Sequence, residues 1–181
     1  KNIAKITDPN KATINSLLFS SDGNYLYYGI NDVTKWDIRN AKKVLTYKGN
    51  LHAKSIELID GEKTLLVGTF AFIVFFDAET GKVKKQLRMK REGVSSLSYS
   101  PEHNLIAYGT TFYHVGLQKK DSDPAKPLAY EEKDDYLSFS EHSYSIVSVM
   151  MNAEAHTVYS CSQDGYIMVW NYERSTFVAF V

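Results

Sequence analysis

Three residues near the end of the chain have the side chains of a nucleophilic active site. Ser160 offers a hydroxyl, His142 an imidazole and Asp164 a carboxylate. An imidazole that is oriented by a carboxylate can take the proton of a serine hydroxyl and so activate the serine for attack on a carbonyl carbon. Acyl transfer is therefore the first chemistry that these residue types suggest.

Other chemistries have no recognisable motif in this sequence. There is no Gly-x-Ser-x-Gly motif, no glycine-rich phosphate-binding loop and no dinucleotide-binding fingerprint. The one cysteine, Cys161, excludes an internal disulfide, and we expect it to be a buried packing residue rather than a reactive thiol. The histidines are scattered without the spacing of a metal site, so we expect neither a metal nor a cofactor. They are His52, His103, His114, His142 and His156.

One basic cluster could bind phosphate groups of a lipid or an RNA. It starts at Lys82 and includes the candidate phosphate-binding residues Lys84, Lys85, Arg88, Lys90 and Arg91. The chain as a whole has 21 basic and 21 acidic residues, so it lacks the broad positive field of most nucleic-acid or membrane binders. We favour the interpretation that these lysines protect a solvated edge strand from pairing with other sheets.

The composition favours strands as the elements that position these residues. Aromatic residues make up 13% of the chain, and runs of four to seven apolar-rich residues alternate with turn sequences such as Asp60-Gly61 and Asp164-Gly165. No stretch keeps a long 3.6-residue apolar period, and no apolar run approaches the roughly 20 residues that span a bilayer. The sequence therefore predicts an all-β protein with regular short strands.

An internal repeat defines the architecture. A serine-led apolar strand recurs at intervals of 39, 41 and 52 residues, beginning at Ser16, Ser55, Ser96 and Ser148. In each copy a second strand and a third strand follow, and the third strands are expected at residues 33–38, 73–77, 113–118 and 167–171. A more polar fourth strand is expected near residues 43–48, 83–87, 127–130 and 176–180. Four antiparallel strands per repeat predict one propeller blade each.

At this level the sequence resembles the WD-repeat β-propeller family, whose unit of about 40 to 45 residues carries Gly-His near its start and Trp-Asp at the end of its third strand. The last repeat matches best, with Glu141-His142 and Trp170-Asn171 in the corresponding places. The resemblance implies that His142, Ser160, Asp164 and Trp170 form a hydrogen-bonded structural tetrad, which favours a structural role over a serine nucleophile. The other repeats depart from the motif, so their blades must depend on packing.

The repeats divide the chain into blades at residues 13–49, 50–89, 90–135 and 136–181. Residues 119–126 and the acidic residues 131–135 are expected to be loops, either solvated or used for docking at the rim. Residues 1–12 are expected to hold an outer strand of a preceding blade and a linker. With no initiator methionine, the chain looks like part of a longer protein. We therefore expect a portion of a larger propeller, commonly seven-bladed in this family, with the remaining blades from the parent chain or another chain.

Aromatic residues in the turns between second and third strands are candidate protein anchors. They are Phe70, Phe112, Tyr113 and Tyr166. The interpretation we favour is a non-catalytic scaffold that binds other proteins in a multiprotein assembly. A regulatory or substrate-receptor domain of a larger enzyme and a phosphoinositide- or RNA-binding propeller are the alternatives. A single cysteine and the absence of any Asn-x-Ser/Thr acceptor predict an intracellular location, in the cytoplasm, the cytoskeleton, a cilium or the nucleus.

Overall fold

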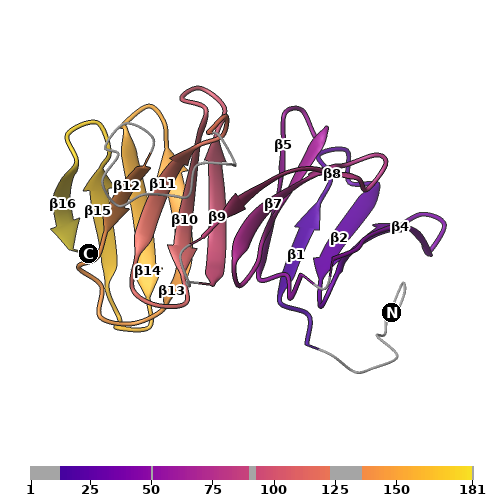
Figure 1. Ribbon diagram of the computed structural model, residues 1–181, viewed down its shortest axis with the longest axis horizontal. Coiled ribbons are helices and arrows are strands. Elements are labelled where there is room, and N and C mark those ends of the chain that lie inside the picture. The colour runs from indigo at the N-terminus through magenta and orange to yellow at the C-terminus, as the bar shows by residue number, and fades with distance from the viewer. Residues whose placement is uncertain (1–12, 50, 90–92, 123–135, 181) are drawn as a thin grey trace.

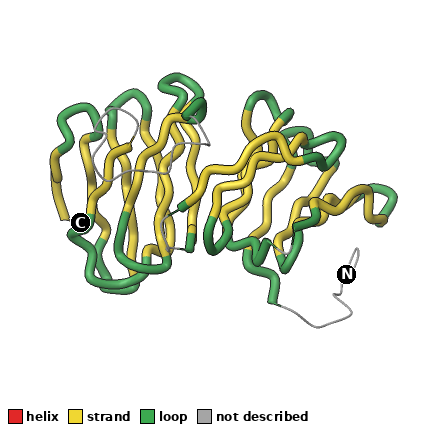
Figure 2. The backbone as a smooth tube through the Cα atoms, in the orientation of Figure 1, coloured by secondary structure: helices red, strands yellow, loops and turns green. Residues whose placement is uncertain are grey.

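The computed structural model describes residues 13–49, 51–89, 93–122 and 136–180, and within these ranges it contains strands, turns and loops but no helix (Figure 2). The strands form four separate four-stranded antiparallel sheets, which confirms the all-β prediction. We call them blades A to D. Blade A contains β1 (Ser16–Phe19), β2 (Tyr25–Gly29), β3 (Val33–Asp37) and β4 (Lys42–Tyr47), and blade B contains β5 (Ser55–Ile59), β6 (Thr64–Gly68), β7 (Phe72–Asp77) and β8 (Val83–Arg88). Blade C contains β9 (Val94–Ser100), β10 (Leu105–Thr110), β11 (Val115–Lys119) and β12 (Tyr136–Phe139), and blade D contains β13 (Ile146–Asn152), β14 (Thr157–Ser162), β15 (Ile167–Asn171) and β16 (Thr176–Phe180).

The blades follow one another along an arc, as propeller blades do (Figure 1). The first strand of each blade lies against the first strand of the next, so β1, β5, β9 and β13 form the inner wall of the arc. Three apolar cores fill the junctions between A and B, B and C, and C and D. Because blades B and C have a neighbour on both faces, their second strands are buried, β6 throughout and β10 except for the partly buried Leu105.

Two of the recurring serines accept a hydrogen bond from the next blade. The backbone N–H of Leu97 on β9 donates to Oγ of Ser55 on β5 at 3.0 Å, and the N–H of Val149 on β13 donates to Oγ of Ser96 on β9 at 3.0 Å. The first strand is the inner edge of its sheet, so these N–H groups have no strand partner on that side and need another acceptor. Ser55 and Ser96 therefore each satisfy a donor of the following blade, whereas Oγ of the equivalent Ser16 in blade A is buried without a hydrogen-bond partner.

A glycine at the end of the second strand sets how closely two blades approach. A Cβ added to Gly68 would lie 2.7 Å from Cγ1 of Val94, and one added to Gly109 would lie closer still to Ile146. Val94 and Ile146 are the first residues of the next inner strand. Glycine is therefore required by the neighbouring blade, which explains why it recurs in the second strands of blades A, B and C.

The residue that ends each third strand controls the turn that follows. Oδ1 of Asp37, Asp77 and Asn171 each accepts the backbone N–H three residues ahead at 2.8 Å and so closes a short turn into the fourth strand. At Asp77 the hydrogen bonds from the N–H and hydroxyl of Thr80 outweigh desolvation and lower the pKa to about 2. In blade C the corresponding position is Gln118, the third strand continues to Lys119, and the connection to the fourth strand is the long segment 120–135.

The fourth strand of blade C is not where the repeat placed it. We expected it at residues 127–130, but β12 is formed by Tyr136–Phe139 and pairs with β11. Blade C therefore extends to Phe139, and the division of blades C and D between residues 135 and 136 is wrong. Phe139 decides the register, because it is buried and stacks on Trp170 with ring centroids 4.7 Å apart. The third strand of this blade also starts two residues later than expected, at Val115.

Several expectations lie outside the described residues. They concern the outer strand within residues 1–12, the loop character of 123–126 and of the acidic residues 131–135, and the basic residues Lys90 and Arg91. Among the residues that the structure does describe, no helix is long and apolar enough to cross a membrane.

Candidate protein-binding face

The structure joins His142, Ser160, Asp164 and Trp170 in one hydrogen-bonded chain. Nδ1 of His142 lies 2.8 Å from Oδ2 of Asp164, and Nε2 of His142 lies 2.8 Å from Oγ of Ser160. The indole N–H of Trp170 donates to the same Oγ at 2.8 Å. The network ties the loop before β13 to β14, to the turn after β14 and to β15, so it holds four segments of blade D together.

Burial and hydrogen bonding separate this network from a serine nucleophile. Ser160 is buried, and its hydroxyl is engaged by both His142 and Trp170, so no substrate carbonyl can approach it. Burial of Asp164 acts to raise its pKa, but hydrogen bonds from the N–H groups of Tyr166 and Ser143 and from His142 outweigh burial and hold the pKa below the ordinary value. The carboxylate therefore stays ionised and orients the imidazole. The arrangement stabilises the blade.

The candidate anchors gather on the face formed by the turns between second and third strands. Phe70 follows β6 and is 65% exposed, Phe112 and Tyr113 follow β10, and Tyr166 precedes β15 and is 54% exposed. Since all blades have the same strand order, these turns lie at the same end of each sheet. Four exposed aromatic rings from three consecutive blades thus share one face of the arc.

Tyr144 belongs to the same face and was missed in the sequence. It lies in the loop that enters blade D and is 63% exposed. Its carbonyl accepts the hydroxyl of Ser162 at 2.9 Å, which places it beside the β14–β15 turn that carries Tyr166. Loop residues show no periodicity in the sequence. The only signal that could have indicated Tyr144 is its place in the loop that enters blade D, at the same face as the turns between second and third strands.

Hydrogen bonds between loops connect the aromatic residues across the blades. The N–H of Thr111 donates to the carbonyl of Gly93 at 2.7 Å, and Gly93 lies close to the ring of Phe70, which brings the turns of blades B and C together. The hydroxyl of Ser145 donates to the carbonyl of Thr111, which joins the turn of blade C to the entering loop of blade D. We call this row the aromatic face; it comprises Phe70, Phe112, Tyr113, Tyr144 and Tyr166.

The ammonium groups of Lys84 and Lys85 contact groups of the protein itself. Nζ of Lys84 donates to the carbonyl of Lys63 at 3.0 Å and to the hydroxyl of Thr64 at 3.1 Å, and lies 3.4 Å from Oδ2 of Asp77. Nζ of Lys85 donates to the carbonyl of Lys120 and lies 5.2 Å from the centroid of the Phe75 ring. These contacts hold the two ammonium groups against blades B and C. Arg88 is exposed at the end of β8.

Cys161 and the histidines form no metal site in the described residues. No three His, Cys, Asp or Glu side chains there are grouped to hold an ion. His103 and His156 stack with ring centroids 4.7 Å apart, and Nδ1 of His103 contacts the hydroxyl of Tyr172, so both imidazoles pack at the junction of blades C and D. Cys161 occupies the place of the junction glycine on the outer face of blade D, where it is partly exposed.

Exposed apolar side chains concentrate on the two end blades. Leu17 and Phe19 on β1 and Met150 on β13 are each more than 60% exposed. The corresponding faces of blades B and C are buried in the junction cores. The outer faces of A and D therefore have the character of junction surfaces without a neighbour among the described residues.

Comparisons with known proteins agree with this geometry. A family model described as "WD domain, G-beta repeat" matches residues 134–171, which include the whole tetrad. A relative, Target of rapamycin complex subunit LST8-1 of Arabidopsis thaliana, is 23% identical over 99 residues, which are 55% of this chain and 30% of the relative. The match thus spans less than one third of that relative's length.

Proposed function

We propose that this chain, which is a WD-repeat protein, is a non-catalytic scaffold that holds other proteins on its aromatic face. The observation that carries the proposal is the set of exposed aromatic rings on the hydrogen-bonded turns and loops of blades B, C and D, all at one face. Aromatic side chains lose little conformational entropy on binding and bury a large area, so they are common anchors of protein interfaces. The tetrad keeps the turns of blade D in place and takes no part in binding.

A multiprotein assembly is the setting that we propose for this scaffold. The relative from Arabidopsis thaliana is named as a subunit of a complex, and a scaffold of this kind fits such a setting. We further propose that other blades, from the parent chain or another chain, cover the outer faces of blades A and D, since exposed apolar side chains gather there. The single cysteine supports a location inside the cell, in the cytoplasm.

The test is affinity purification of the tagged full-length protein with quantitative mass spectrometry. A variant with Phe70→Ser, Phe112→Ser and Tyr144→Ser removes three anchors that are exposed and contribute little to folding. The control carries Val44→Ser and Val83→Ser, which replace similarly exposed apolar residues on the outer strands β4 and β8. We expect the first variant to lose a defined set of co-purifying proteins by about tenfold or more, as removal of interface anchors does, and the control to keep them.

Equal recovery of all proteins by the wild type and the aromatic-face variant would contradict the proposed binding face. Equal loss in both variants would also contradict it, because the effect would then follow general surface hydrophobicity. Thermal unfolding of each variant, measured in parallel, shows that the fold is retained.

A further inference from the structure

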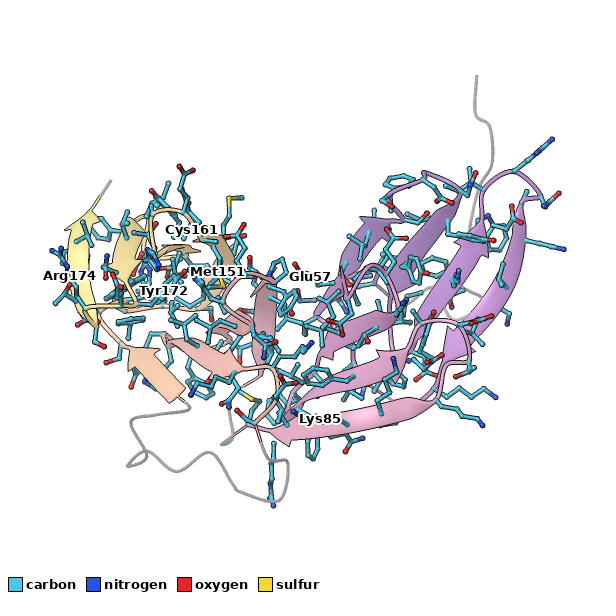
Figure 3. The ribbon with its side chains drawn as sticks, turned by 90° about the horizontal axis from the view of Figure 1, so that it is seen from above. Glu57, Lys85, Met151, Cys161, Tyr172 and Arg174 are labelled. Carbon is cyan, nitrogen blue, oxygen red and sulfur yellow. The ribbon has the colours of Figure 1, made fainter. Side chains whose placement is uncertain are left out.

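Glu57 is the one charged residue on the first and second strands of all four blades. These eight strands are fully described, and their other members are apolar, hydroxyl-bearing, amide or glycine residues. Glu57 lies on β5 and points from the inner wall of blade B towards blade C, between the two halves of the molecule (Figure 3). A carboxyl group in such surroundings needs a specific role, since burying a charge is costly.

The carboxyl group of Glu57 makes a second hydrogen bond across the junction between blades B and C. Its Oε1 accepts the backbone N–H of Tyr99 on β9 at 3.1 Å. The next junction has the same bond with a neutral acceptor, where the N–H of Met151 donates to Oγ of Ser98 at 3.1 Å. The two junctions are thus matched in geometry, and only the one between B and C depends on a group that can gain or lose a proton.

The groups around Glu57 leave its charge uncompensated. Among the described residues no cationic side chain pairs with it. The strands that pack on β5 are β1, β2, β6 and β9, and their titratable side chains are phenols, on β2 and β9. At the nearby turns Lys120 is bound to Asp60 at 2.8 Å, while its Nζ lies 5.8 Å from the Tyr99 ring centroid. Burial therefore raises the pKa of Glu57 to about 7, against the opposing effect of the Tyr99 N–H.

We propose that the junction between blades B and C is proton-responsive: protonated Glu57 holds the two blades together, and its ionisation loosens them. The proton goes to solvent, and no other group is needed. The same junction carries Phe70 on one side and Phe112 on the other, so loosening changes the spacing of two anchors of the aromatic face. Only the effect on the spacing of Phe70 and Phe112 rests on the proposed function.

The direction follows from proton linkage. A carboxyl group whose pKa is about 7 in the closed junction and 4.5 in the open one binds more protons when closed between these values. Closure is then fully favoured at low pH and weakens as the pH rises. The ratio of open to closed junction should increase about tenfold between pH 6 and pH 8 and change little above pH 8.

The experiment is NMR spectroscopy of the full ¹⁵N-labelled chain from pH 5 to pH 9. We expect the amide resonance of Tyr99 to shift with a midpoint near the pKa of Glu57, and the hydrogen-exchange protection factor of Tyr99 to fall about tenfold from pH 6 to pH 8. Met151 is the internal control, since its acceptor Ser98 does not titrate, and it should show neither change. Glu57→Gln keeps an acceptor oxygen and should remove the response of Tyr99.

A Tyr99 amide that does not respond to pH, or that responds equally in Glu57→Gln, overturns the proposal. A shifting resonance with an unchanged protection factor also overturns it, because the junction would then titrate without loosening. Loss of partners by the aromatic-face variant is independent of these outcomes, so failure of the junction proposal and failure of the proposed function are distinguishable.

Discussion

Replacing Trp170 by alanine tests how blade D is held together. Trp170 is fully buried, its ring stacks on Phe139 of blade C, and its N–H is bound to Ser160. A buried Trp covers roughly 150–250 Å², which at about 25 cal/mol per Å² corresponds to about 4–6 kcal/mol. Observed losses for Trp→Ala in cores are about 3–5 kcal/mol. We therefore expect Trp170→Ala to lower the free energy of unfolding by about 4 kcal/mol.

Trp36 is the matched control. It stands at the same place of blade A, before Asp37, but it is only half-buried and belongs to the face without a described neighbour. We expect Trp36→Ala to cost about 1–2 kcal/mol, since less apolar area returns to water. Urea unfolding followed by circular dichroism measures both values. Should Trp170→Ala not fold, Trp170→Phe keeps a ring and still removes the hydrogen bond.

A change of less than about 0.5 kcal/mol for Trp170→Ala, the range of an ordinary surface substitution, would refute the tetrad as a stabilising network. Equal losses of unfolding free energy for Trp170→Ala and Trp36→Ala would refute the claim that Trp170 is buried by the junction of blades C and D and not by its own blade.

Three further substitutions test the tetrad and the junctions. The pKa of Asp164 is lowered in the folded protein, so its contribution to stability is present above the unfolded value of 3.8 and is lost as the pH falls through the folded pKa. Asp164→Asn should therefore lower the free energy of unfolding at pH 7 and flatten its decline between about pH 5 and pH 3, as measured by urea unfolding. A parallel decline in the wild type and the variant would count against this role. Gly109→Ala places a Cβ against Ile146 and should lower the free energy of unfolding by about 1–3 kcal/mol. Cys161→Ala, at the equivalent place of blade D, should lower it by less than about 1 kcal/mol, because no described blade covers that place. A larger loss for Cys161→Ala in thermal unfolding would show that contact with the next blade does not require the glycine.

Much of this fold was predictable from the sequence, because the repeat and the alternation of apolar residues are local signals. The tetrad was also open to prediction, since His142, Ser160, Asp164 and Trp170 are distinct residue types within one repeat. The bond from Glu57 to Tyr99 was not, because it joins residues 42 positions apart in different blades. No local pattern marks a side chain that serves the neighbouring blade.

The misplaced fourth strand of blade C has a comparable cause. Residues 127–130 and Tyr136–Phe139 are both short apolar-rich runs beside the acidic segment, and strand propensity does not separate them. The stacking of Phe139 on Trp170 distinguishes them, and that contact exists only after blades C and D have packed. Because this contact is tertiary, the sequence alone did not place the fourth strand of blade C correctly.

Residue-specific amide hydrogen exchange in Ser96→Ala tests most directly whether the inner strands are fastened blade to blade. Oγ of Ser96 accepts the N–H of Val149, whereas the N–H of Leu97 depends on Ser55 in the preceding junction. We predict that exchange at Val149 accelerates about tenfold or more, corresponding to loss of one hydrogen bond of about 1.4 kcal/mol, while exchange at Leu97 stays as in the wild type. Unchanged exchange at Val149 would contradict the claim that the Ser96 hydroxyl of blade C holds the inner strand of blade D.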